Sequence, residues 1–393
     1  MTAQKIAIIG GGVIGLAVAR ALALQGVEVT VFEQQHLGAG TSSTTFAWVN
    51  SNGKQPQSYH LLNVLSMEEH LKLQHAQPNG LRWLETGGTW EWAAEGDAQQ
   101  RLLQRATSLQ SAGYAAREAS PADVLRDIPE LRAQAISGSV WHFPTESVLH
   151  PALYLARLWS EAKAHGALLY QHQRINSISE SADRVTLDLE NGEQWQGDRI
   201  VLATGRWANQ LLNSLELNLA LLDTSKPNAV ACSFLVHTAP QPLSLSANLI
   251  SPQLNVRPDG GGRLLLQALE LDHLADSAAP PSITSDIAAQ FRARYHALFA
   301  DAGELHIEQI VVGQRARPAD GLPAIGYVTA HQRVYVAVTH SGITLSPLIG
   351  KLVAEELVSD VASDLLSDFR PQRLMGKSVE EFAPIKRNFP AAQ

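Results

Sequence analysis

A strand that runs directly into a glycine-rich turn constrains this chain more than any other feature. Residues 6–9 form an uninterrupted apolar run, which is typical of a strand covered on both faces in a parallel sheet. A G-x-G-x-x-G pattern follows at 10–15, and apolar residues then recur at helical spacing to about residue 25. A second apolar strand at 27–32 completes a β–α–β unit. The sequence therefore predicts an α/β fold that opens with a Rossmann-like unit.

The three glycines of this pattern have separate physical roles. Gly10 permits the tight turn, Gly12 lets the backbone approach a pyrophosphate, and Gly15 lets the helix and the strand pack closely. The helix that begins with Val13 and Ile14 would present free N–H groups and the positive end of its dipole to the phosphates. The pattern therefore predicts a dinucleotide-binding site at the carboxyl end of the first strand.

A single acidic residue, Glu33, narrows the choice of dinucleotide. It stands at the end of the second strand, 18 residues after Gly15, near the spacing expected for a carboxylate that accepts from ribose hydroxyls. A carboxylate repels a 2′-phosphate, which argues against NADP. NAD and the ADP half of FAD both stay open on this evidence. A glycine-rich turn without a ligand would leave the position of Glu33 unexplained.

Composition and charge exclude several other kinds of site. The only cysteine, Cys232, rules out an internal disulfide and a C-x-x-C metal or redox motif. The 14 histidines show no ligand spacing with a nearby acid, so we expect no metal centre. The 30 basic and 38 acidic residues give a net charge of −8, which argues against nucleic acid as a partner. We expect no targeting segment and no spanning helix, and we predict a cytoplasmic location.

The rest of the chain alternates between two kinds of pattern. Strand–helix units recur at 151–205 and near the end, where an apolar strand at 334–338 leads into a helix expected from about Ser346 to Val358. The intervening segments hold short strands and turns of antiparallel type, as at 254–270. The chain is therefore expected to weave twice between two domains.

Seven short segments follow one another along the chain in a recognisable order. They are residues 10–33, 40–43, 146–151, 203–207, 257–260, 317–326 and 340–350. Together they resemble the D-amino-acid oxidase family of FAD-dependent amine oxidoreductases, which includes glycine oxidase, sarcosine oxidase and D-amino-acid dehydrogenase. Each segment alone is a weak match, but the full series in the right order makes a chance match improbable.

The resemblance implies a Rossmann-like FAD-binding domain interleaved with an antiparallel-sheet (α+β) substrate domain. We expect the discontinuous FAD-binding domain to comprise residues 1–80, 145–215 and 312–393, and the substrate-binding domain to comprise 81–144 and 216–311. The flavin ring would lie between the two domains. The returning C-terminal segment favours FAD, since a plain NAD enzyme does not need it.

The resemblance also assigns candidate residues for the cofactor. By position in the family's motifs they are Gly10, Gly12, Val13, Ile14, Gly15, Glu33, Thr41, Ser42, Ser43, Thr204, Gly205, Trp207, Gly342, Ile343 and Thr344. The final helix would direct its positive end toward the pyrimidine side of the flavin, with the N–H groups of Gly342 and Ile343 as donors. An ordinary C-terminal helix is the alternative.

An arginine and a histidine are the candidate catalytic residues. Arg317 occupies the family's R-P position, where several members bind the substrate carboxylate, and a planar guanidinium suits a carboxylate in bidentate fashion. Arg315 lies two residues away and would share a strand face with Arg317. A structural salt bridge is the alternative for either arginine. His340 begins the segment 340–350, which resembles the family's flavin-ring motif, and its alternative is a packing or hydrogen-bonding role.

Two departures from the family pattern bear on the chemistry. Sarcosine oxidases attach flavin through a cysteine near the segment of Arg315, where this chain has none, so we expect non-covalent FAD. Cys232 instead falls in an expected strand of the substrate domain, as a buried small hydrophobe. Those oxidases also carry a lysine, thought to promote the reaction with oxygen, before a glycine in the strand after the Arg257 hairpin. Here residues 264–267 read Leu-Leu-Leu-Gln, which leaves a dehydrogenase open.

These observations predict an enzyme that oxidises the C–N bond of a small amino acid or secondary amine by hydride transfer to FAD. Oxygen, a quinone or another carrier would accept the electrons. The alternatives are an NAD-dependent dehydrogenase and a flavin-carrying subunit of a larger complex, in which FAD is mainly structural. The sequence identifies neither the substrate nor the role of the polar loop at 50–54.

Overall fold

A six-stranded, mostly parallel sheet forms one layer of the computed structural model, which describes residues 4–77, 80–226, 229–300 and 302–385. Its strands are, in spatial order, β19 (Ala324–Tyr327), β20 (Val334–Val338), β13 (Arg199–Leu202), β1 (Lys5–Ile9), β2 (Glu28–Phe32) and β9 (Leu168–Tyr170). β1 pairs in parallel with both β2 and β13, whereas β19 joins the edge antiparallel to β20. The first and last parts of the chain therefore meet in one sheet.

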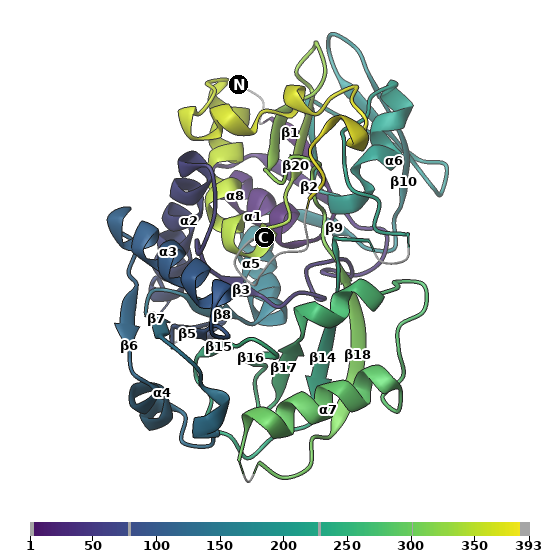
Figure 1. Ribbon diagram of the computed structural model, residues 1–393. Helices are drawn as coiled ribbons and strands as arrows, with labels where there is room; N and C mark the ends of the chain where they lie inside the picture. The colour runs from purple at the N-terminus through teal and green to yellow at the C-terminus, as the bar shows by residue number, and fades with distance from the viewer. Residues whose placement is uncertain (1–3, 78–79, 227–228, 301, 386–393) are drawn as a thin grey trace.

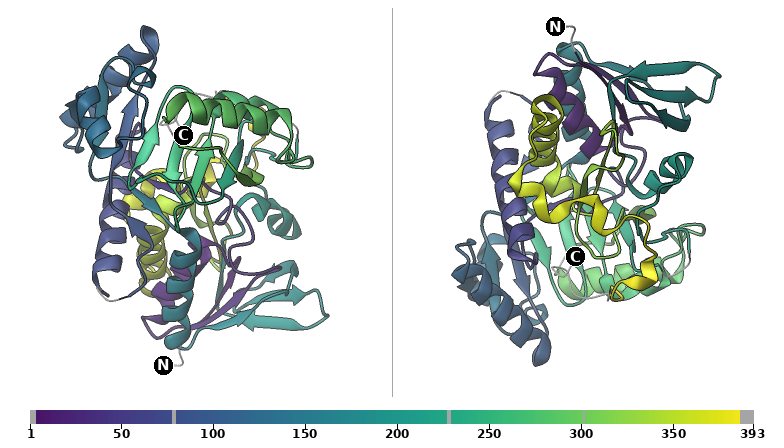
Figure 2. Two further views of the ribbon diagram at one scale, coloured as in Figure 1. Left: turned by 90° about the horizontal axis from the view of Figure 1, so that it is seen from below. Right: turned by 90° about the horizontal axis from the view of Figure 1, so that it is seen from above.

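Both faces of this sheet are covered, which explains the uninterrupted apolar run in β1. Ile6 and Ile8 belong to a core formed with α1 (Val13–Ala23), α5 (Pro151–Ala164) and α8 (Gly342–Ser359). Ala7 and Ile9 belong to a second core on the opposite face. That core is formed with β10 (Ile175–Glu180), β11 (Val185–Leu189), β12 (Gln194–Gly197) and α6 (Ala208–Leu212). The β10–β12 sheet projects from the body of the molecule in both views of Figure 2.

An eight-stranded sheet forms a second layer and is antiparallel except for one pair. Its strands are, in spatial order, β18 (Ile307–Gln314), β14 (Cys232–Thr238), β17 (Leu264–Gln267), β16 (Asn255–Pro258), β15 (Asn248–Ile250), β5 (Thr89–Trp92), β7 (Val140–Phe143) and β6 (Arg117–Ala119). The parallel pair, β5 with β15, joins two segments that lie far apart in the sequence. Helix α7 (Asp286–Leu298) lies across β14, β17 and β18 in Figure 1. The predicted combination of a Rossmann-like sheet with an antiparallel sheet is confirmed.

A small fourth sheet and several helices connect the two layers. The sheet has the order β3 (Trp48–Val49), β8 (Ser147–Leu149), β4 (Leu84–Glu85). The long helix α2 (Gln57–His75) packs beside α8, while α3 (Asp97–Ser111) and α4 (Pro121–Asp127) lie on the side of β6 and β7 (Figure 1). The short 3-10 helices are η1 (Ala133–Ala135), η2 (Gly205–Trp207), η3 (Asn213–Leu215), η4 (Leu269–Leu274), η5 (Asp364–Phe369), η6 (Pro371–Arg373) and η7 (Val379–Glu381). Among the described residues, none of the helices has the length and apolar character needed to span a membrane.

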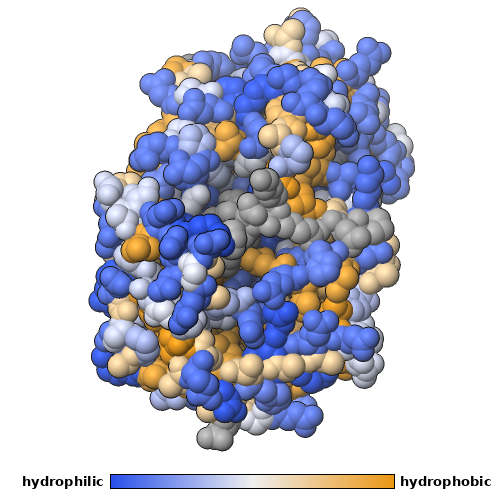
Figure 3. Space-filling view, viewed as in Figure 1, coloured by the Kyte–Doolittle hydropathy of each residue, from blue (hydrophilic) through white to orange (hydrophobic). Residues whose placement is uncertain are grey.

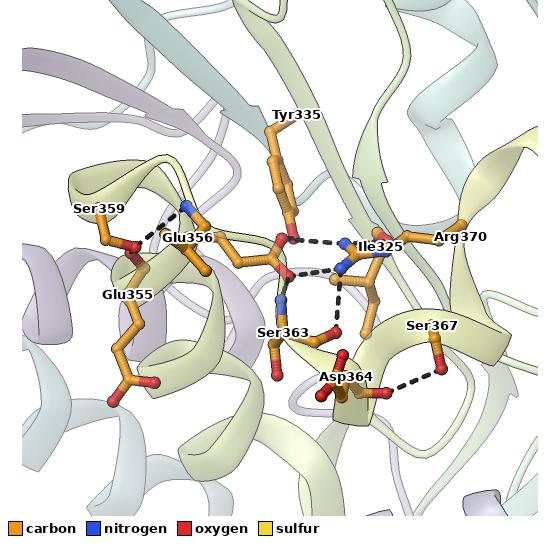
Figure 4. A network of polar contacts seen from close by, with 10 residues as sticks. Ile325, Tyr335, Glu355, Glu356, Ser359, Ser363, Asp364, Ser367 and Arg370 are labelled. Atoms are coloured by element: carbon orange, nitrogen blue, oxygen red, sulfur yellow. Dashed lines mark hydrogen bonds and ion pairs between the residues drawn. The ribbon is translucent and has the colours of Figure 1, made fainter.

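A buried carboxylate ties the C-terminal segment to the six-stranded sheet. Arg370 donates to both oxygens of Glu356 at 2.6 and 2.9 Å, and the hydroxyl of Tyr335 on β20 donates to the same carboxylate at 2.6 Å (Figure 4). The backbone N–H of Ser363 adds a further bond at 2.7 Å. Burial opposes ionisation of Glu356, but these donors hold its pKa below the usual value. The network therefore fixes the C-terminal end of α8 against the sheet.

The surface seen in Figure 3 is mostly hydrophilic, with hydrophobic residues in small separate patches. Single exposed apolar residues such as Val361 are ordinary for a folded protein. The residues that form the candidate site lie inside the protein, where the two large sheets approach each other.

Candidate active site

Three neighbouring cavities lead from the carboxyl end of β1 to the eight-stranded sheet. The cofactor cavity is lined by residues from 9–14, 32–45, 173–176, 203–211 and 337–343. The junction cavity, of about 80 Å³, is lined among others by Trp48, Asn50, Lys54, Gln267, Arg315 and His340. The large cavity, of about 600 Å³, is lined among others by Glu91, Arg101, Arg105, Gln267, Arg315 and Arg317. His340 lines the first two cavities and Arg315 the last two, so the three are adjacent.

The turn after β1 has the geometry that the glycine pattern requires. Gly10 has a φ of +110°, a conformation that side-chain-bearing residues rarely adopt. A Cβ on Gly15 would lie 1.9 Å from the carbonyl oxygen of Gly10, so only glycine lets α1 pass this close to the turn. Ser42 reaches over from the following loop and accepts a hydrogen bond from the N–H of Val13 at 3.0 Å. Small residues thus shape the wall of the cofactor cavity.

Glu33 lines the cofactor cavity and is held in place by backbone donors. One carboxylate oxygen accepts from the N–H of Gly11 at 2.8 Å, and the other accepts from the N–H of Gln35 at 2.8 Å. These bonds fix the carboxylate beside the glycine-rich turn. Each oxygen has a further lone pair available, so the arrangement is compatible with acceptance from a ribose hydroxyl.

The amino ends of α1 and α8 meet at the cofactor cavity. Helix α8 begins at Gly342 rather than near Ser346, so the expected start was four residues too late. A Cβ on Gly342 would lie 3.6 Å from Val13, which places the first turns of the two helices in contact. The N–H groups of Gly342 and Ile343 precede the first bond of the helix, from Leu345 to Ser341, so they are available as donors. Two positive helix ends therefore face one cavity.

A proline inside α8 explains why the sequence suggested a later start. Pro347 has no N–H, so it cannot bond to the carbonyl of Ile343 one turn earlier. The Nε2 atom of His70 on α2 donates to that carbonyl at 2.8 Å, and the hydroxyl of Ser346 adds a bond at 3.2 Å. Burial lowers the pKa of His70 to about 4, so its ring is neutral and acts as a donor here. The first turn of α8 therefore depends on a side chain from another helix.

The cofactor cavity fits the pyrophosphate and ribose groups of a dinucleotide. The hydroxyl of Thr204 is buried in its wall without a hydrogen-bond partner among the described residues, as expected where a ligand supplies one. A Cβ on Gly12 would lie only 3.0 Å from the Ser42 hydroxyl, so larger residues would crowd this wall. Arg206 also lines the cavity, stacks 3.7 Å from the centre of the Trp207 ring and donates to Thr41 at 3.1 Å. The sequence did not identify Arg206 as a candidate cofactor residue.

Most of the predicted cofactor residues come together in this cavity. Those that line it are Gly10, Gly12, Val13, Ile14, Glu33, Thr41, Ser42, Thr204, Gly205, Trp207, Gly342 and Ile343. The other three lie elsewhere. Gly15 packs against the turn, the hydroxyl of Ser43 donates to the Gly38 carbonyl at 2.5 Å, and Thr344 lines the junction cavity.

The two predicted catalytic residues lie on opposite sides of the junction cavity. Arg317 is only 8% exposed and lines the large cavity, and its Nε atom has no hydrogen-bond partner within the described part of the chain. Burial and the neighbouring Arg315 lower the pKa of Arg317 to about 10, so it stays cationic at neutral pH. A buried guanidinium with a second, partly buried guanidinium beside it favours an anionic ligand. The ring of His340 lies 6.2 Å from that of Tyr59, between the cofactor cavity and the junction cavity.

Two further polar groups face the junction cavity. The hydroxyl of Ser233 and the Nε2 atom of Gln267 are both buried, and neither has a hydrogen-bond partner in the ranges that the structure describes. Gln267 ends β17, the strand to which the family resemblance assigns the lysine–glycine pair of sarcosine oxidases. Gln267 lines both the junction cavity and the large cavity, so it lies between them.

Lys54 is the main functional candidate that sequence reasoning left without a role. It ends the polar loop 50–54, lines the junction cavity and is only 5% exposed. Burial, and then Arg317 and Arg315, lower the pKa of Lys54 to about 7, against the opposing effect of Glu146. No local pattern marks this environment, because Arg315, Arg317 and Glu146, which act on the pKa of Lys54, lie far from it in the sequence.

Comparison with known proteins identifies the family of this chain. A family model described as FAD dependent oxidoreductase matches residues 5–356. Glycine oxidase from Geobacillus kaustophilus is 26% identical over 379 residues, which cover 95% of this chain and 97% of the relative. One subunit of the opine oxidase from Agrobacterium tumefaciens is 24% identical, over 93% of this chain and 96% of that subunit.

Solved structures agree in fold. The crystal structure of glycine oxidase from Geobacillus kaustophilus matches with a TM-score of 0.81 at 22% identity, over 95% of this chain and 99% of that one. Iminodiacetate oxidase from Chelativorans matches with a TM-score of 0.77 at 18% identity, over 93% and 99%. At these identities the structural likeness establishes the architecture.

Proposed function

This chain belongs to the family of FAD dependent oxidoreductases, and from that premise we propose that it oxidises the C–N bond of a carboxylate-bearing amine. The predicted use of FAD is confirmed by the family match, which also decides against the NAD-dependent alternative. Bound FAD supplies the two-electron acceptor for a hydride. The chain's own contribution is to bind the dinucleotide, orient the substrate and manage its proton.

Residues of the cofactor cavity would hold the FAD. The glycines of the turn and the first N–H groups of α1 would face the pyrophosphate, and Glu33 would accept from the ribose. The N–H groups of Gly342 and Ile343 would act as donors on the flavin side. Neither the sequence around Arg315 nor the segment 340–350 contains a cysteine, and Cys232 is a buried residue of β14, so we propose non-covalent attachment.

The observation that carries the substrate proposal is the buried Arg317 with the partly buried Arg315 next to it, beside the junction. Arg317 would bind the substrate carboxylate, because its buried fork supplies the counter-charge that a desolvated carboxylate needs. His340, at the border of the cofactor cavity, would help to position the reacting carbon.

The large cavity favours a substrate bulkier than glycine. At about 600 Å³ it falls within the range of about 300–1,000 Å³ that is usual for ligands well above that size. Its walls carry Arg101, Arg105 and Glu91, with Arg105 and Glu91 paired at 2.5 Å, so a polar extension is accommodated. Relatives are named for glycine, opine and iminodiacetate. Among these chemistries, we propose an amino acid whose nitrogen or side chain carries a further polar arm.

The electron acceptor and the location also belong to the proposal. Oxygen, a quinone or another carrier would reoxidise the flavin, and Gln267 in place of the lysine–glycine pair favours a carrier other than oxygen. The single buried cysteine is compatible with the reducing cytoplasm that we predict.

We propose the same discontinuous domains as the sequence suggested. Strands of the six-stranded sheet come from 1–80, 145–215 and 312–393, and those of the eight-stranded sheet from 81–144 and 216–311. One strand, β18, crosses the boundary at residue 312, and the small sheet of β3, β8 and β4 draws on both sets.

The test is a substrate panel on the purified holoprotein. Glycine, sarcosine, proline, D-alanine, iminodiacetate and an N-carboxyalkyl amino acid are each mixed anaerobically with the protein, and bleaching of the flavin absorbance is followed. Turnover is then measured with oxygen and with an artificial acceptor in separate assays. Bleaching by a carboxylated amine supports the proposal, and failure of every carboxylated amine rejects it.

A second candidate function is a flavin-carrying subunit of a larger complex. The observation that favours it is the relative whose name makes it one subunit of an opine oxidase. Absence of bleaching by the protein alone, with bleaching restored by a co-purified partner, would establish this role.

A further inference from the structure

Lys54 occupies a position where a buried ammonium group is costly. It lies on the loop between β3 and α2, is 5% exposed and lines the junction cavity between the cofactor cavity and the large cavity. A lysine is rarely buried so completely, since its charged form loses hydration. Its placement between the two cavities calls for a chemical reason.

The groups that face Lys54 come from four elements and set its proton affinity. Arg315 and Arg317, which follow β18, disfavour the ammonium form, whereas Glu146, which precedes β8, favours it. Its Nζ atom lies 5.8 Å from the centre of the Tyr59 ring on α2. His340, which follows β20, lines the same cavity.

The net result is an amine that can change its protonation state near neutrality. Burial together with the two arginines lowers the pKa of Lys54 to about 7. Burial raises the pKa of Glu146 to about 8, so this carboxyl is largely protonated at neutral pH and gives Lys54 little counter-charge. Lys54 can therefore accept a proton in the pH range where the enzyme works.

The reaction needs such a base. The substrate arrives mainly as an ammonium ion, whose nitrogen has no free electron pair. Loss of a hydride from the adjacent carbon requires that pair, because it forms the new C=N bond. A group within the site must first remove the proton.

Resting on the proposed function, we propose that Lys54 is the base that takes this proton and that binding of the substrate carboxylate at Arg315 and Arg317 activates it. The carboxylate neutralises the positive field that suppresses protonation of Lys54, so the lysine becomes a stronger base when a carboxylated substrate is bound. The N–H bond of the substrate breaks, a new bond forms at Nζ, and the electron pair stays on the substrate nitrogen. The proton returns to solvent after the product leaves.

Other titratable groups near the junction are less suited. Both oxygens of Glu146 already accept, from Trp48 at 2.8 Å and from Tyr114 at 2.9 Å, and Glu146 lines none of the three cavities. The hydroxyl of Tyr59 donates to Ser341 at 2.8 Å, and burial raises its pKa to about 12. His340 is the remaining competitor, and the experiment includes it.

The first test is the pH dependence of anaerobic flavin reduction. For the wild type we expect kcat/KM for a carboxylated amine to rise with pH through a transition set by Lys54. Lys54→Met should lose that transition and fall about 100-fold at pH 7.5, in the range of lost general-base catalysis. Lys72→Met, an exposed site on α2, is the matched control and should leave the profile unchanged. An unchanged profile in Lys54→Met, or loss of the transition in His340→Gln alone, would overturn the proposal.

The second test uses no turnover. Calorimetric binding of propanoate, which has a carboxylate but no amine, is measured at pH 7.5 in buffers of different ionisation enthalpy. We expect the wild-type holoprotein to take up a substantial fraction of one proton, and Lys54→Met to take up none. No uptake by the wild type, or equal uptake by both proteins, rejects the role of Lys54. Failure of the proposed function is distinguishable, because then no carboxylated amine reduces the flavin even in the wild type.

Discussion

The cofactor cavity and the cavities on the substrate side are formed by different kinds of chemical group. The first is shaped by backbone and small residues: Gly10 and Gly15 at the turn, and the hydroxyls of Ser42 and Thr204. The second is built around buried ionisable side chains, above all Arg317 and Lys54. A site made of backbone N–H groups needs no buried charge of its own. A site made of buried charges keeps them at a desolvation cost that a charged ligand offsets.

This difference predicts two kinds of sensitivity. The cofactor cavity should respond to changes of shape and to loss of single hydrogen bonds. The substrate side should respond to changes of charge and to pH, because the pKa values of Lys54 and Arg317 are lowered there. Substitutions on each side can break or sharpen this contrast, beginning with the largest expected effect.

Removal of the buried arginine fork should have the largest effect. Arg317→Ala leaves a desolvated substrate carboxylate without its counter-charge, so we expect a loss of about 2–4 kcal/mol in kcat/KM for a carboxylated amine. Arg317→Lys should lose less and should mainly raise KM, since a point charge replaces the planar fork. Steady-state kinetics of both variants measure the loss, with the flavin spectrum as the check on folding.

The control for Arg317 is an amine without a carboxylate. Its kcat/KM should change little in Arg317→Ala, because it makes no bond to the guanidinium. Equal losses for both substrates would show that Arg317 serves the fold, and unchanged kinetics would move the carboxylate contact to Arg315.

His70 makes the one strong pH response that we expect beside the cofactor cavity. Its pKa is about 4 in the folded protein, below the usual value of 6.5, so the unfolded chain binds the proton more tightly. The contribution of His70 to stability is therefore complete above about pH 6.5 and is lost as pH falls through about 4, a change of about 3 kcal/mol. Denaturant titrations of the wild type between pH 4 and pH 8 measure it.

His70→Gln sharpens this prediction. Its amide can still donate to the Ile343 carbonyl but does not titrate, so the variant should lose this part of the pH dependence. His75→Gln, at the exposed end of the same helix, should keep the wild-type curve. If His70→Gln shows the same dependence of stability on pH as the wild type, other groups are responsible for that dependence.

Glu33→Ala should weaken FAD binding by about 1.5–3 kcal/mol, the range for a hydrogen bond to a charged group. The loss should appear in the affinity for FAD and not in the turnover of the FAD-saturated protein. Equilibrium dialysis against FAD measures it. Glu28→Ala, an exposed residue on the same strand, provides the control. Retention of flavin at wild-type levels would contradict the ribose contact.

The last prediction is that substitution of Cys232 leaves the release of FAD by acid unchanged. Acid precipitation should release free FAD from the wild type and equally from Cys232→Ser, because we propose non-covalent attachment and Cys232 is a buried residue of β14. Absorbance of the supernatant and the pellet gives the result. Flavin that stays in the wild-type pellet would reveal a covalent bond.

The cofactor half could be predicted from the sequence because its signals are local. The first strand, the glycine turn, α1 and Glu33 occupy one contiguous stretch, 5–33, in which each residue type follows from its immediate neighbours. The start of α8 could not be read this way. A proline within the helix normally marks its first turn, and only the contact from His70 on another helix lets α8 begin earlier.

The substrate half was harder to predict for the same reason. Arg317 was found through a family motif, whereas Lys54 carried no local signal of burial. Its environment depends on Arg315 and Glu146, which lie far from it in the chain and reach it only through the fold. Perturbed proton affinities arise from such long-range encounters, so a sequence pattern does not display them.

The cofactor cavity joins the two ends of the chain, and this has a consequence for synthesis. Its walls need Gly10 from the first turn and Gly342 from the start of α8, which contacts α1 and follows β20, the partner strand of β13. A nascent chain shorter than about 343 residues therefore lacks part of the flavin wall. We expect cofactor loading to follow synthesis of the chain through the start of α8, so that uptake of FAD marks a polypeptide that already holds both walls of the cavity.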